Sequence, residues 1–344
     1  MKNIIRDLLE AVIVWLLVFL MTISNLISPL DYIVKDALYQ RPRGVSGDIK
    51  IIGIDERTLE ELGPIGTWSR QYYADLLEIL NADEASKPAV VGFDIIFSGN
   101  VHEAGDEAFA NAAKKSGNVV VASQLIYKEK PEVDADGVKY YPIDTIIYPY
   151  EALRAEVTCA YTNVSQDSDR TVRRVLMKES YAGQEQTMFP QAIYERYCEK
   201  TGQTINTIAS DKTGRTLINY SGKPGDYECI SLVDVLQGKI DTRVFKDSIV
   251  LVGAYAAGMQ DNFNVPNGGN QQMYGVEIHA NILQAFMQNR FSVNGNPFLF
   301  GLLTGFVCAI LHFVFKRTKI WLSTILLIAG VAANLIAGVI LNNN

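Results

Sequence analysis

Three long runs without a charged residue constrain this chain more than any other feature. They comprise residues 11–30, 291–315 and 320–344. A transmembrane helix needs about 20 consecutive, mostly apolar residues, so each run is long enough to cross a bilayer. The first run is longer than the apolar core of a signal peptide, and no small-x-small cleavage site follows it. We therefore predict three transmembrane α-helices, the first of them an uncleaved anchor.

Basic residues between the second and third runs set the expected orientation in the membrane. Lys316, Arg317 and Lys319 lie in a loop that contains no acidic residue, and such loops remain in the cytoplasm. The N-terminus then lies in the cytoplasm too, and the central segment lies outside it. We predict three parts: a cytoplasmic stub with the first helix, residues 1–30; an extracytoplasmic domain, residues 31–290; and two helices joined by a cytoplasmic loop, residues 291–344.

The composition of the central segment excludes some partners. The chain has a formal net charge of −7, although its N-terminus is neutral and its basic loop is positive, so the central segment is strongly acidic. An acidic domain is a poor binder of nucleic acid, so we expect no nucleic-acid partner. The three predicted helices, in contrast, would contact membrane lipid. The segment holds an odd number of cysteines without zinc-type spacing, so at most one disulfide forms. We favour buried thiols for Cys159, Cys198 and Cys229.

Apolar strands alternate with amphipathic helices in the first half of the central segment. Residues 49–55, 89–97 and 118–122 are nearly continuous in apolar residues, as expected for strands that are covered on both faces. Residues 70–80 and 106–115 have helical spacing. This order predicts parallel pairing through right-handed crossovers. We predict an α/β fold with a mixed, largely parallel sheet and helices on both faces.

The second half alternates less regularly. Proline-rich residues 126–150 indicate a long loop or a hairpin insertion. Residues 159–164 and 171–178 predict an antiparallel hairpin, with Asp167 and Asp169 in a turn that pairs with nearby arginines. Apolar patterns predict further strands at residues 216–220 and 248–254, and helices at residues 188–198, 231–236 and 278–289.

Two acidic residues follow predicted strands and are candidates for a site. Asp55 and Asp94 lie at or near the carboxyl ends of their strands, where ligands bind in open parallel sheets. They could bind a ligand, or they could act as a general acid and base. Alternatively, each caps a loop or pairs with Arg70, whose guanidinium could bridge both carboxylates. We favour the ion pair over a ligand role, and a ligand role over catalysis.

A second group of candidates surrounds the last predicted helix. Asp261, Glu277 and His279 could form a metal set, although a carboxylate near a helix N-terminus also favours the helix dipole without any ligand. The stretch from Gly253 to Gly258 has the glycine spacing of a P-loop but lacks its lysine, which excludes nucleotide hydrolysis. We therefore expect no cofactor, and we leave the metal open.

Several motifs, in this order, resemble one known family. They are Ile52-Gly53-Ile54-Asp55, Gly92-Phe93-Asp94, Asp106, Asp169 before Arg173-Arg174, Leu251-Val252-Gly253, Asp261 and Gly275-Val276-Glu277-Ile278-His279-Ala280-Asn281. Together they resemble the CHASE sensor domain of type two, an extracellular sensory module of bacterial cyclases and histidine kinases. The resemblance covers most of residues 36–290. It implies an exterior sensor between membrane helices, ligand recognition without catalysis, and a cytoplasmic cyclase or kinase output.

We predict that the chain is the input module of a receptor in the plasma membrane, with its output domain beyond this chain. An unknown small-molecule or extracellular ligand would contact Asp55, Arg70, Asp94, Asp261, Glu277 and His279. The rivals are a membrane-anchored hydrolase that uses Asp55 and Asp94, and an assembly protein without a site. Small residues at every fourth position in the last two runs favour close helix packing, within one chain or across the homodimer that we expect.

Overall fold

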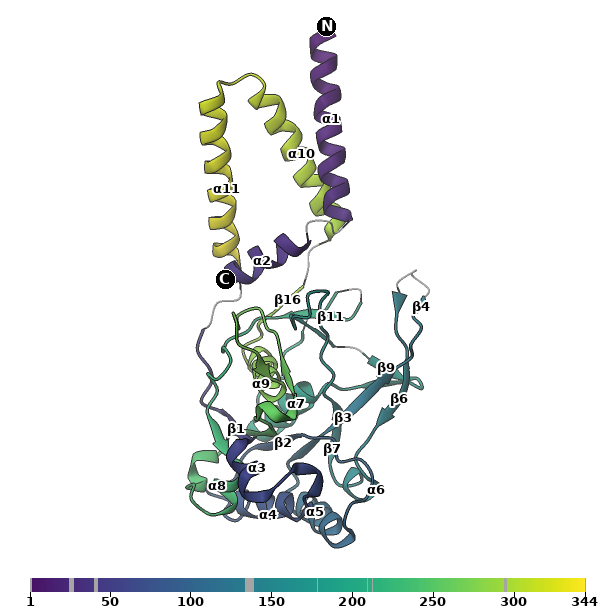
Figure 1. Ribbon diagram of the computed structural model, residues 1–344, viewed down its shortest axis with the longest axis vertical. Coiled ribbons are helices and arrows are strands. Elements are labelled where there is room, and N and C mark those ends of the chain that lie inside the picture. The colour runs from purple at the N-terminus through teal and green to yellow at the C-terminus, as the bar shows by residue number, and fades with distance from the viewer. Residues whose placement is uncertain are drawn as a thin grey trace. The chain divides into compact units, whose positions relative to one another are not determined.

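The computed structural model describes residues 2–24, 28–39, 43–133, 139–177, 179–208, 210–211, 213–293 and 296–343. Contacts divide the chain into two compact units. The terminal segments, Met1–Arg41 and Asn294–Asn344, form a helical unit, and Pro42–Val293 forms an α/β unit. Figure 1 labels many of the elements of both units.

The helical unit contains four helices within its described residues: α1 (Lys2–Ile23), α2 (Ser28–Tyr39), α10 (Pro297–Phe315) and α11 (Ile320–Asn343). Helices α1 and α10 pack closely because small residues of α10 face aromatic residues of α1. A methyl group at Gly305 would lie 2.9 Å from the Trp15 carbonyl, and one at Gly301 would lie 3.1 Å from the Phe19 ring. Packing of these small residues within one chain is therefore observed, and the homodimer stays a prediction.

Of the three membrane spans that the sequence predicts, the described residues support one. One helix of the described residues is long and apolar enough to cross a membrane by length and composition, over Phe298–Phe315 with a mean hydropathy of 2.3. Helix α1 ends at Ile23, so its uncharged part is shorter than the run in the sequence. In α11 the side chains are described as far as Ala332, and the apolar stretch among them is Ile320–Ala332. Membrane spans at α1 and α11 are therefore not confirmed, and they stay a prediction.

A seven-stranded sheet forms the centre of the α/β unit in the described part of the chain. Its strands lie in the order β12 (Cys229–Ser231), β1 (Ile49–Ile54), β13 (Ile249–Ala254), β2 (Val90–Asp94), β3 (Val119–Tyr127) and β6 (Ile143–Ile147), and β7 (Thr158–Tyr161) also pairs with β3. The strand β6 runs antiparallel to β3, and the other pairs are parallel. The predicted mixed, largely parallel sheet is confirmed.

The strand β13 occupies the middle of this sheet. It pairs with β1 through Ile49 and Ile249, and with β2 through Ile249 and Val90. All six of its residues are buried, as expected for a strand with a helical layer on each face. Strands β1 and β2 follow each other along the chain, but they are not neighbours in the sheet because β13 lies between them.

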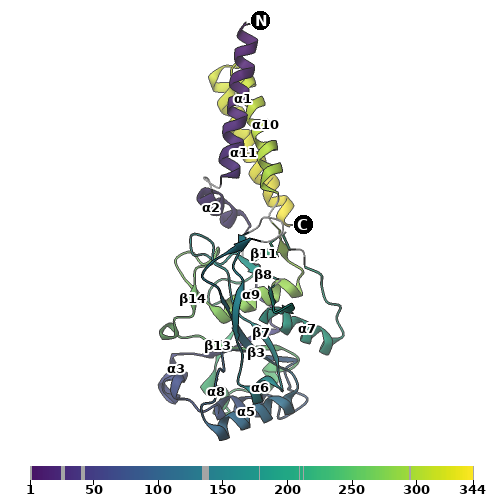
Figure 2. The ribbon, with the colours of Figure 1, turned by 90° about the vertical axis from the view of Figure 1, so that its right-hand side faces the viewer.

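Helices cover both faces of the sheet, as Figures 1 and 2 show. Alternate residues of β13 enter two different cores: Ile249 and Leu251 pack with α7 and α9, whereas Val250 and Val252 pack with α4, α5 and α8. These helices are α4 (Gln71–Leu80), α5 (Glu103–Ser116), α7 (Phe189–Thr201), α8 (Leu232–Leu236) and α9 (Gly275–Met287). The prediction of helices on both faces is confirmed.

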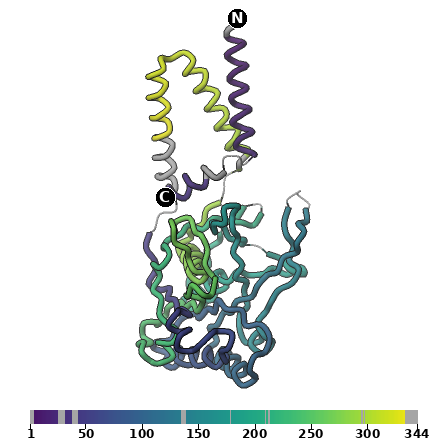
Figure 3. The backbone as a smooth tube through the Cα atoms, in the orientation of Figure 1, coloured from purple at the N-terminus to yellow at the C-terminus, as the bar shows by residue number. Residues whose placement is uncertain are grey.

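Shorter elements surround this framework, and the chain can be followed through them in Figure 3. The short helices are α3 (Glu56–Leu62), α6 (Glu151–Arg154) and the 3-10 turns η1 (Ile65–Thr67), η2 (Thr242–Phe245) and η3 (Ala257–Met259). A three-stranded sheet joins β8 (Arg174–Leu176), β11 (Arg215–Ile218) and β16 (Phe291–Ser292). The pairs are β4 (Glu132–Val133) with β5 (Lys139–Tyr140), β9 (Glu179–Tyr181) with β10 (Gln184–Gln186), and β14 (Asn262–Phe263) with β15 (Met273–Tyr274).

Local patterns located most elements but not their partners. The predicted hairpin of residues 159–164 and 171–178 is wrong, because β7 joins the central sheet beside β3 and β8 pairs with β11. Its turn was predicted correctly, since Arg173 pairs with Asp169 at 2.9 Å and with Asp167 at 3.3 Å. The four cysteines carry free thiols; of the three expected to be buried, Cys198 is buried, whereas Cys159 and Cys229 are half-buried.

A glycine in β2 permits the close approach of α7. A Cβ atom on Gly92 would lie 2.5 Å from Ile193 Cδ1 and 3.0 Å from the Phe189 ring. We expect Gly92→Ala to lower the free energy of unfolding by roughly 1–3 kcal/mol, because overpacking strains a dense core. Urea denaturation of the full chain measures this change.

Two further variants control the experiment. Gly258→Ala should change stability by less than about 0.5 kcal/mol, because no atom lies within 4 Å of the new methyl group. Adding Ile193→Val to Gly92→Ala removes the clashing Cδ1 atom and should recover part of the loss. A Gly92→Ala variant as stable as the unaltered chain would contradict the packing described here.

Candidate functional site

Asp55 follows β1 and caps the next helix. Its Oδ1 accepts hydrogen bonds from the Thr58 amide at 2.9 Å and from the Thr58 hydroxyl at 2.6 Å, which satisfies the N-terminus of α3. The Ser231 hydroxyl donates to the same oxygen at 2.8 Å. Of the roles considered for Asp55, the structure shows the cap, which also ties α3 to the end of β12.

Arg70 forms a buried ion pair, but not with either predicted partner. Its Nη1 donates to Asp106 Oδ1 at 2.9 Å, and its Nη2 donates to the Ser98 carbonyl at 3.0 Å. The side chains of Arg70 and Asp106 are only 6% and 7% exposed, and the guanidinium lies 4.3 Å from the centre of the Tyr150 ring. The predicted bridge from Arg70 to Asp55 and Asp94 is wrong, because the guanidinium is occupied by the first turn of α5 and the Ser98 carbonyl.

Asp94 at the end of β2 lies in a different cluster, with Asp261 and His279. His279 Nε2 is 3.7 Å from Asp94 Oδ1, which is too long for a hydrogen bond. The two side chains are 4% and 10% exposed, respectively, and the His279 ring meets Phe189 edge-on. His279 Nδ1 is buried without a hydrogen-bond partner among the described residues. Asp94 and Asp55 therefore belong to separate environments, on strands that β13 separates.

Burial shifts the protonation of this cluster. It raises the pKa of Asp94 to about 7. Burial, together with the charge of Asp94, raises the pKa of Asp261 to about 6. Burial lowers the pKa of His279 to about 4, although Asp261 acts in the opposite direction. All three side chains are therefore mainly neutral between about pH 4 and about pH 6.

The metal set considered from the sequence does not assemble. Positions two apart on a helix face different sides, and accordingly Glu277 and His279 contact different surroundings. Among the described residues, no group of three or more His, Cys, Asp or Glu side chains is placed to hold a metal ion.

Glu277 lies in the first turn of α9 and is nearly inaccessible, with 1% exposure. Its Oε1 accepts from the Gly225 amide at 2.7 Å and from the Tyr255 hydroxyl at 3.4 Å. Its Oε2 accepts from the Tyr274 amide at 3.3 Å, as in a capping box. Burial raises the pKa of Glu277, and the bond from Gly225 partly opposes this shift. The carboxylate thus connects α9 to the loop before β12 and to the residue after β13.

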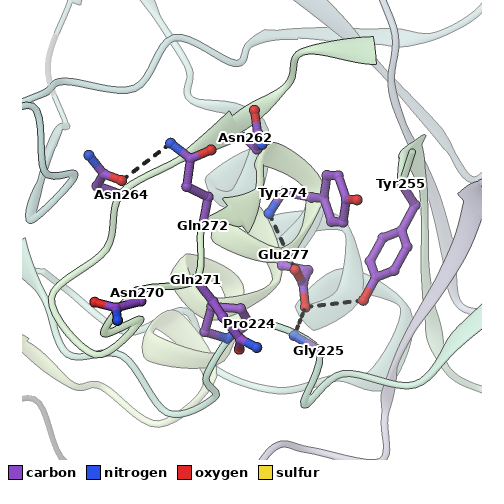
Figure 4. A pocket seen from close by; sticks show the side chains of 10 residues that line it. All are labelled: Pro224, Gly225, Tyr255, Asn262, Asn264, Asn270, Gln271, Gln272, Tyr274 and Glu277. Atoms are coloured by element: carbon purple, nitrogen blue, oxygen red, sulfur yellow. Dashed lines mark hydrogen bonds between the residues drawn. The ribbon is translucent and has the colours of Figure 1, made fainter. Parts of the chain in front are cut away.

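A pocket of about 600 Å³ adjoins Glu277 (Figure 4). It lies where β13 ends, which is the side of a parallel sheet on which ligands usually bind. One wall holds the rings of Tyr255 and Tyr274, whose centres are 4.6 Å apart. The loop residues Pro224 and Gly225 form another part of the lining. The remaining lining residues all carry side-chain amides: Asn262, Asn264, Asn270, Gln271 and Gln272.

Glu277 is the one member of the six predicted site residues that lines this pocket. Asp94, Asp261 and His279 come together elsewhere, whereas Asp55 and Arg70 each support a helix N-terminus. The sequence analysis missed the amide residues between Asp261 and Gly275. Their signal was available in the sequence as a segment rich in asparagine, glutamine and glycine.

The open polar pocket at the carboxyl end of β13 makes this mixed α/β unit a candidate ligand-binding domain. A family model, the CHASE2 domain, matches residues 12–317, which is most of the chain. The chain belongs to the CHASE2 domain family. Because this is a family of extracellular sensory domains rather than of catalytic ones, the chain contains a sensory module. Comparison with curated proteins and with solved structures found no match.

The raised pKa of Asp94 makes stability depend on pH. The folded state keeps the Asp94 proton to about pH 7, whereas the unfolded chain releases it near the ordinary value of 3.8. The contribution of Asp94 to stability is therefore lost as the pH rises from about 4 to about 7. We expect Asp94→Asn to become more stable than the unaltered chain as the pH rises from about 5 to 8, by roughly 1–3 kcal/mol.

Urea titrations followed by the fluorescence of Trp68, with the other two tryptophans replaced by phenylalanine, measure this difference. His279 contributes with the opposite sign but is present in both proteins. Because the charge of Asp94 also raises the pKa of Asp261, the difference between the curves reports the titration of Asp94 together with its effect on Asp261. Glu78→Gln on the exposed face of α4 is the control and should show no such trend. A pH-independent difference for Asp94→Asn would contradict the buried, protonated state.

Proposed function

We propose that this chain is the input module of a multi-pass receptor in the plasma membrane. A small polar ligand binds the pocket beside α9, and the resulting shift of α9 passes along the chain to the membrane helices. A cyclase or kinase output then receives the signal on the cytoplasmic side. The proposal agrees with the sensory family and gives the pocket and helix α9 definite roles.

The observation that carries this proposal is the position of α9. Its first turn forms part of the pocket through Glu277. Near its other end, Gln284 accepts from the Ser46 amide at 3.0 Å and donates to the Gly44 carbonyl at 3.0 Å. Two residues further along is Phe286, whose ring lies 4.9 Å from that of Phe291 in β16.

These contacts join the pocket to both chain connections of the α/β unit. Gly44 and Ser46 lie in the segment that enters this unit after α2, and Phe291 lies in the segment that leaves it towards α10. Helix α9 is packed in the core over most of its length, so it moves as a rigid rod. A shift of about 1–2 Å, the size seen in helix-based switches, would therefore reach both connections.

Ion pairs between α1 and α10 support the proposed orientation. Lys316 at the end of α10 pairs with Asp7 at 2.7 Å and also with Glu10, so the N-terminal part of α1 lies beside the basic loop. Antiparallel helices in this arrangement would place the N-terminus and the loop on one side of the membrane, and the α/β unit on the other. We propose that α1 and α11 cross the bilayer together with α10.

The two rival functions find less support. A hydrolase based on Asp55 and Asp94 needs both carboxylates at one cleft, but Asp55 caps α3 and neither residue lines the pocket. An assembly protein without a site has no use for a pocket of this size and polarity. The proposed sensor, in contrast, assigns a role both to the pocket and to helix α9.

Cysteine labelling in intact cells tests the orientation. We expect Glu78→Cys in the α/β unit to react with a membrane-impermeant maleimide in intact cells. Thr318→Cys in the basic loop should react only after the membrane is permeabilised. The unaltered chain, which carries four cysteines of its own, provides the background level. Labelling of Thr318→Cys from outside would overturn the proposed topology.

Amide hydrogen exchange tests the coupling through α9. Glu277→Gln keeps the shape of the side chain but removes its charge, so the Gly225 and Tyr274 amides should exchange roughly tenfold faster. If α9 transmits changes, the amides of β11 and β16 should also exchange faster. Glu228→Gln, on the surface outside the pocket, should leave both regions unchanged. Faster exchange confined to the pocket would count against transmission.

A further inference from the structure

We propose that the pocket beside α9 recognises a neutral saccharide or a related polyol. This inference names the ligand class of the proposed sensor and therefore rests on that function. Three observations support it: side-chain amides dominate the lining, most of these amides form no hydrogen bond within the protein, and the described lining residues include no basic side chain that would pair with an anionic ligand.

Side-chain amides dominate the polar lining. Each amide offers two N–H donors and a carbonyl acceptor at fixed separation. A sugar hydroxyl both donates and accepts, and neighbouring hydroxyls on a ring match such paired groups. A cluster of amides is therefore suited to a ligand with several adjacent hydroxyl groups, whereas a ligand with one charged group would use few of them.

Most of these amides remain available. Gln272 donates to Asn264 Oδ1 at 3.3 Å, which orients this pair. In the described part of the chain, the side chains of Asn262, Asn270 and Gln271 form no internal hydrogen bond, and Figure 4 shows them among the side chains that line the pocket. Asn270 and Gln271 are exposed, so water occupies their hydrogen-bonding positions until a ligand replaces it.

The two tyrosines supply an apolar surface beside these polar groups. The rings of Tyr255 and Tyr274 are tilted by 36° and lie next to Glu277. Aromatic faces pack well against the C–H side of a sugar ring, while polar groups bind its edge. The volume of about 600 Å³ falls within the usual range for small-molecule sites and accommodates a ligand the size of a mono- or disaccharide.

The charges of the lining disfavour other classes. No lysine, arginine or histidine is among the described residues that line the pocket, so a phosphate or carboxylate ligand would lack a counter-charge. The one carboxylate, Glu277, already accepts three hydrogen bonds from the protein. Because three of its roughly four acceptor positions are occupied and the side chain is nearly inaccessible, Glu277 is poorly placed to pair with the ammonium group of a ligand.

Saturation-transfer NMR and calorimetric titration with the full chain test this proposal. The chain is placed in nanodiscs of phosphatidylcholine and phosphatidylglycerol, because detergents with sugar headgroups would compete. The saccharide probes are glucose, maltose, N-acetylglucosamine and myo-inositol, and the comparison probes are putrescine, inorganic phosphate and glutamine. We expect at least one saccharide probe to bind with a Kd below about 1 mM, and the comparison probes to bind more weakly.

Variants locate the binding. Asn270→Ala and Gln271→Ala lie in an exposed loop, so they leave the fold intact and should each weaken binding by roughly threefold to tenfold. Tyr255→Ala should weaken it by at least about tenfold. Gln203→Ala, an exposed amide outside the pocket, should change the affinity by less than about twofold.

Three results would overturn the saccharide class. They are no binding of any saccharide probe, saccharide binding that the pocket variants leave unchanged, and tighter pocket binding of a comparison probe. In the last case the sensor function would stand and only its ligand class would fall. Conversely, saccharide binding together with external labelling of Thr318→Cys would retain the ligand class and overturn the receptor topology.

Discussion

The strand β13 is the element on which the rest of the α/β unit depends. It pairs in parallel with β1 and β2, and each of its six residues is buried between two helical layers. The chain can place a strand there only if both faces are apolar, which explains its unbroken run of aliphatic and small residues. Because β13 ends at the middle of the sheet, the residues that follow it, from Tyr255 to the start of α9, lie over the carboxyl edge and form most of the pocket.

Helix α9 links this edge to the rest of the molecule through buried polar contacts. Asn281 Oδ1 accepts from the Ser221 and Gly222 amides at 3.0 and 2.9 Å, and Gln284 Oε1 accepts from the Tyr227 hydroxyl at 2.8 Å. A buried polar group is costly unless its bonds are made, so these contacts fix the helix in one position. The same rigidity that stabilises the unit allows a change at the pocket to affect both chain connections.

The sequence predicted local elements well and their partners poorly. Apolar runs located β1, β2 and β13, and helical spacing located α4, α5 and α7, because these signals come from neighbours along the chain. The position of β13 between β1 and β2 could not be predicted, since hydrogen-bond partners far apart in sequence leave no periodic trace. For the same reason Arg70 was matched to Asp55 and Asp94, although its partner is Asp106 on the next helix. Of the six predicted site residues, Glu277 alone reached the pocket.

The sequence by itself determined the alternation of strands and helices, the apolar character of the terminal helices and, through motifs in a fixed order, the family. These properties reside in single segments, whose burial and charge depend on composition and spacing. Only the tertiary structure decided which residues form a site. Whether a carboxylate caps a helix, pairs with an arginine or faces a pocket depends on strand order and on the direction of each helix, and both are set by packing between segments that are distant in the chain.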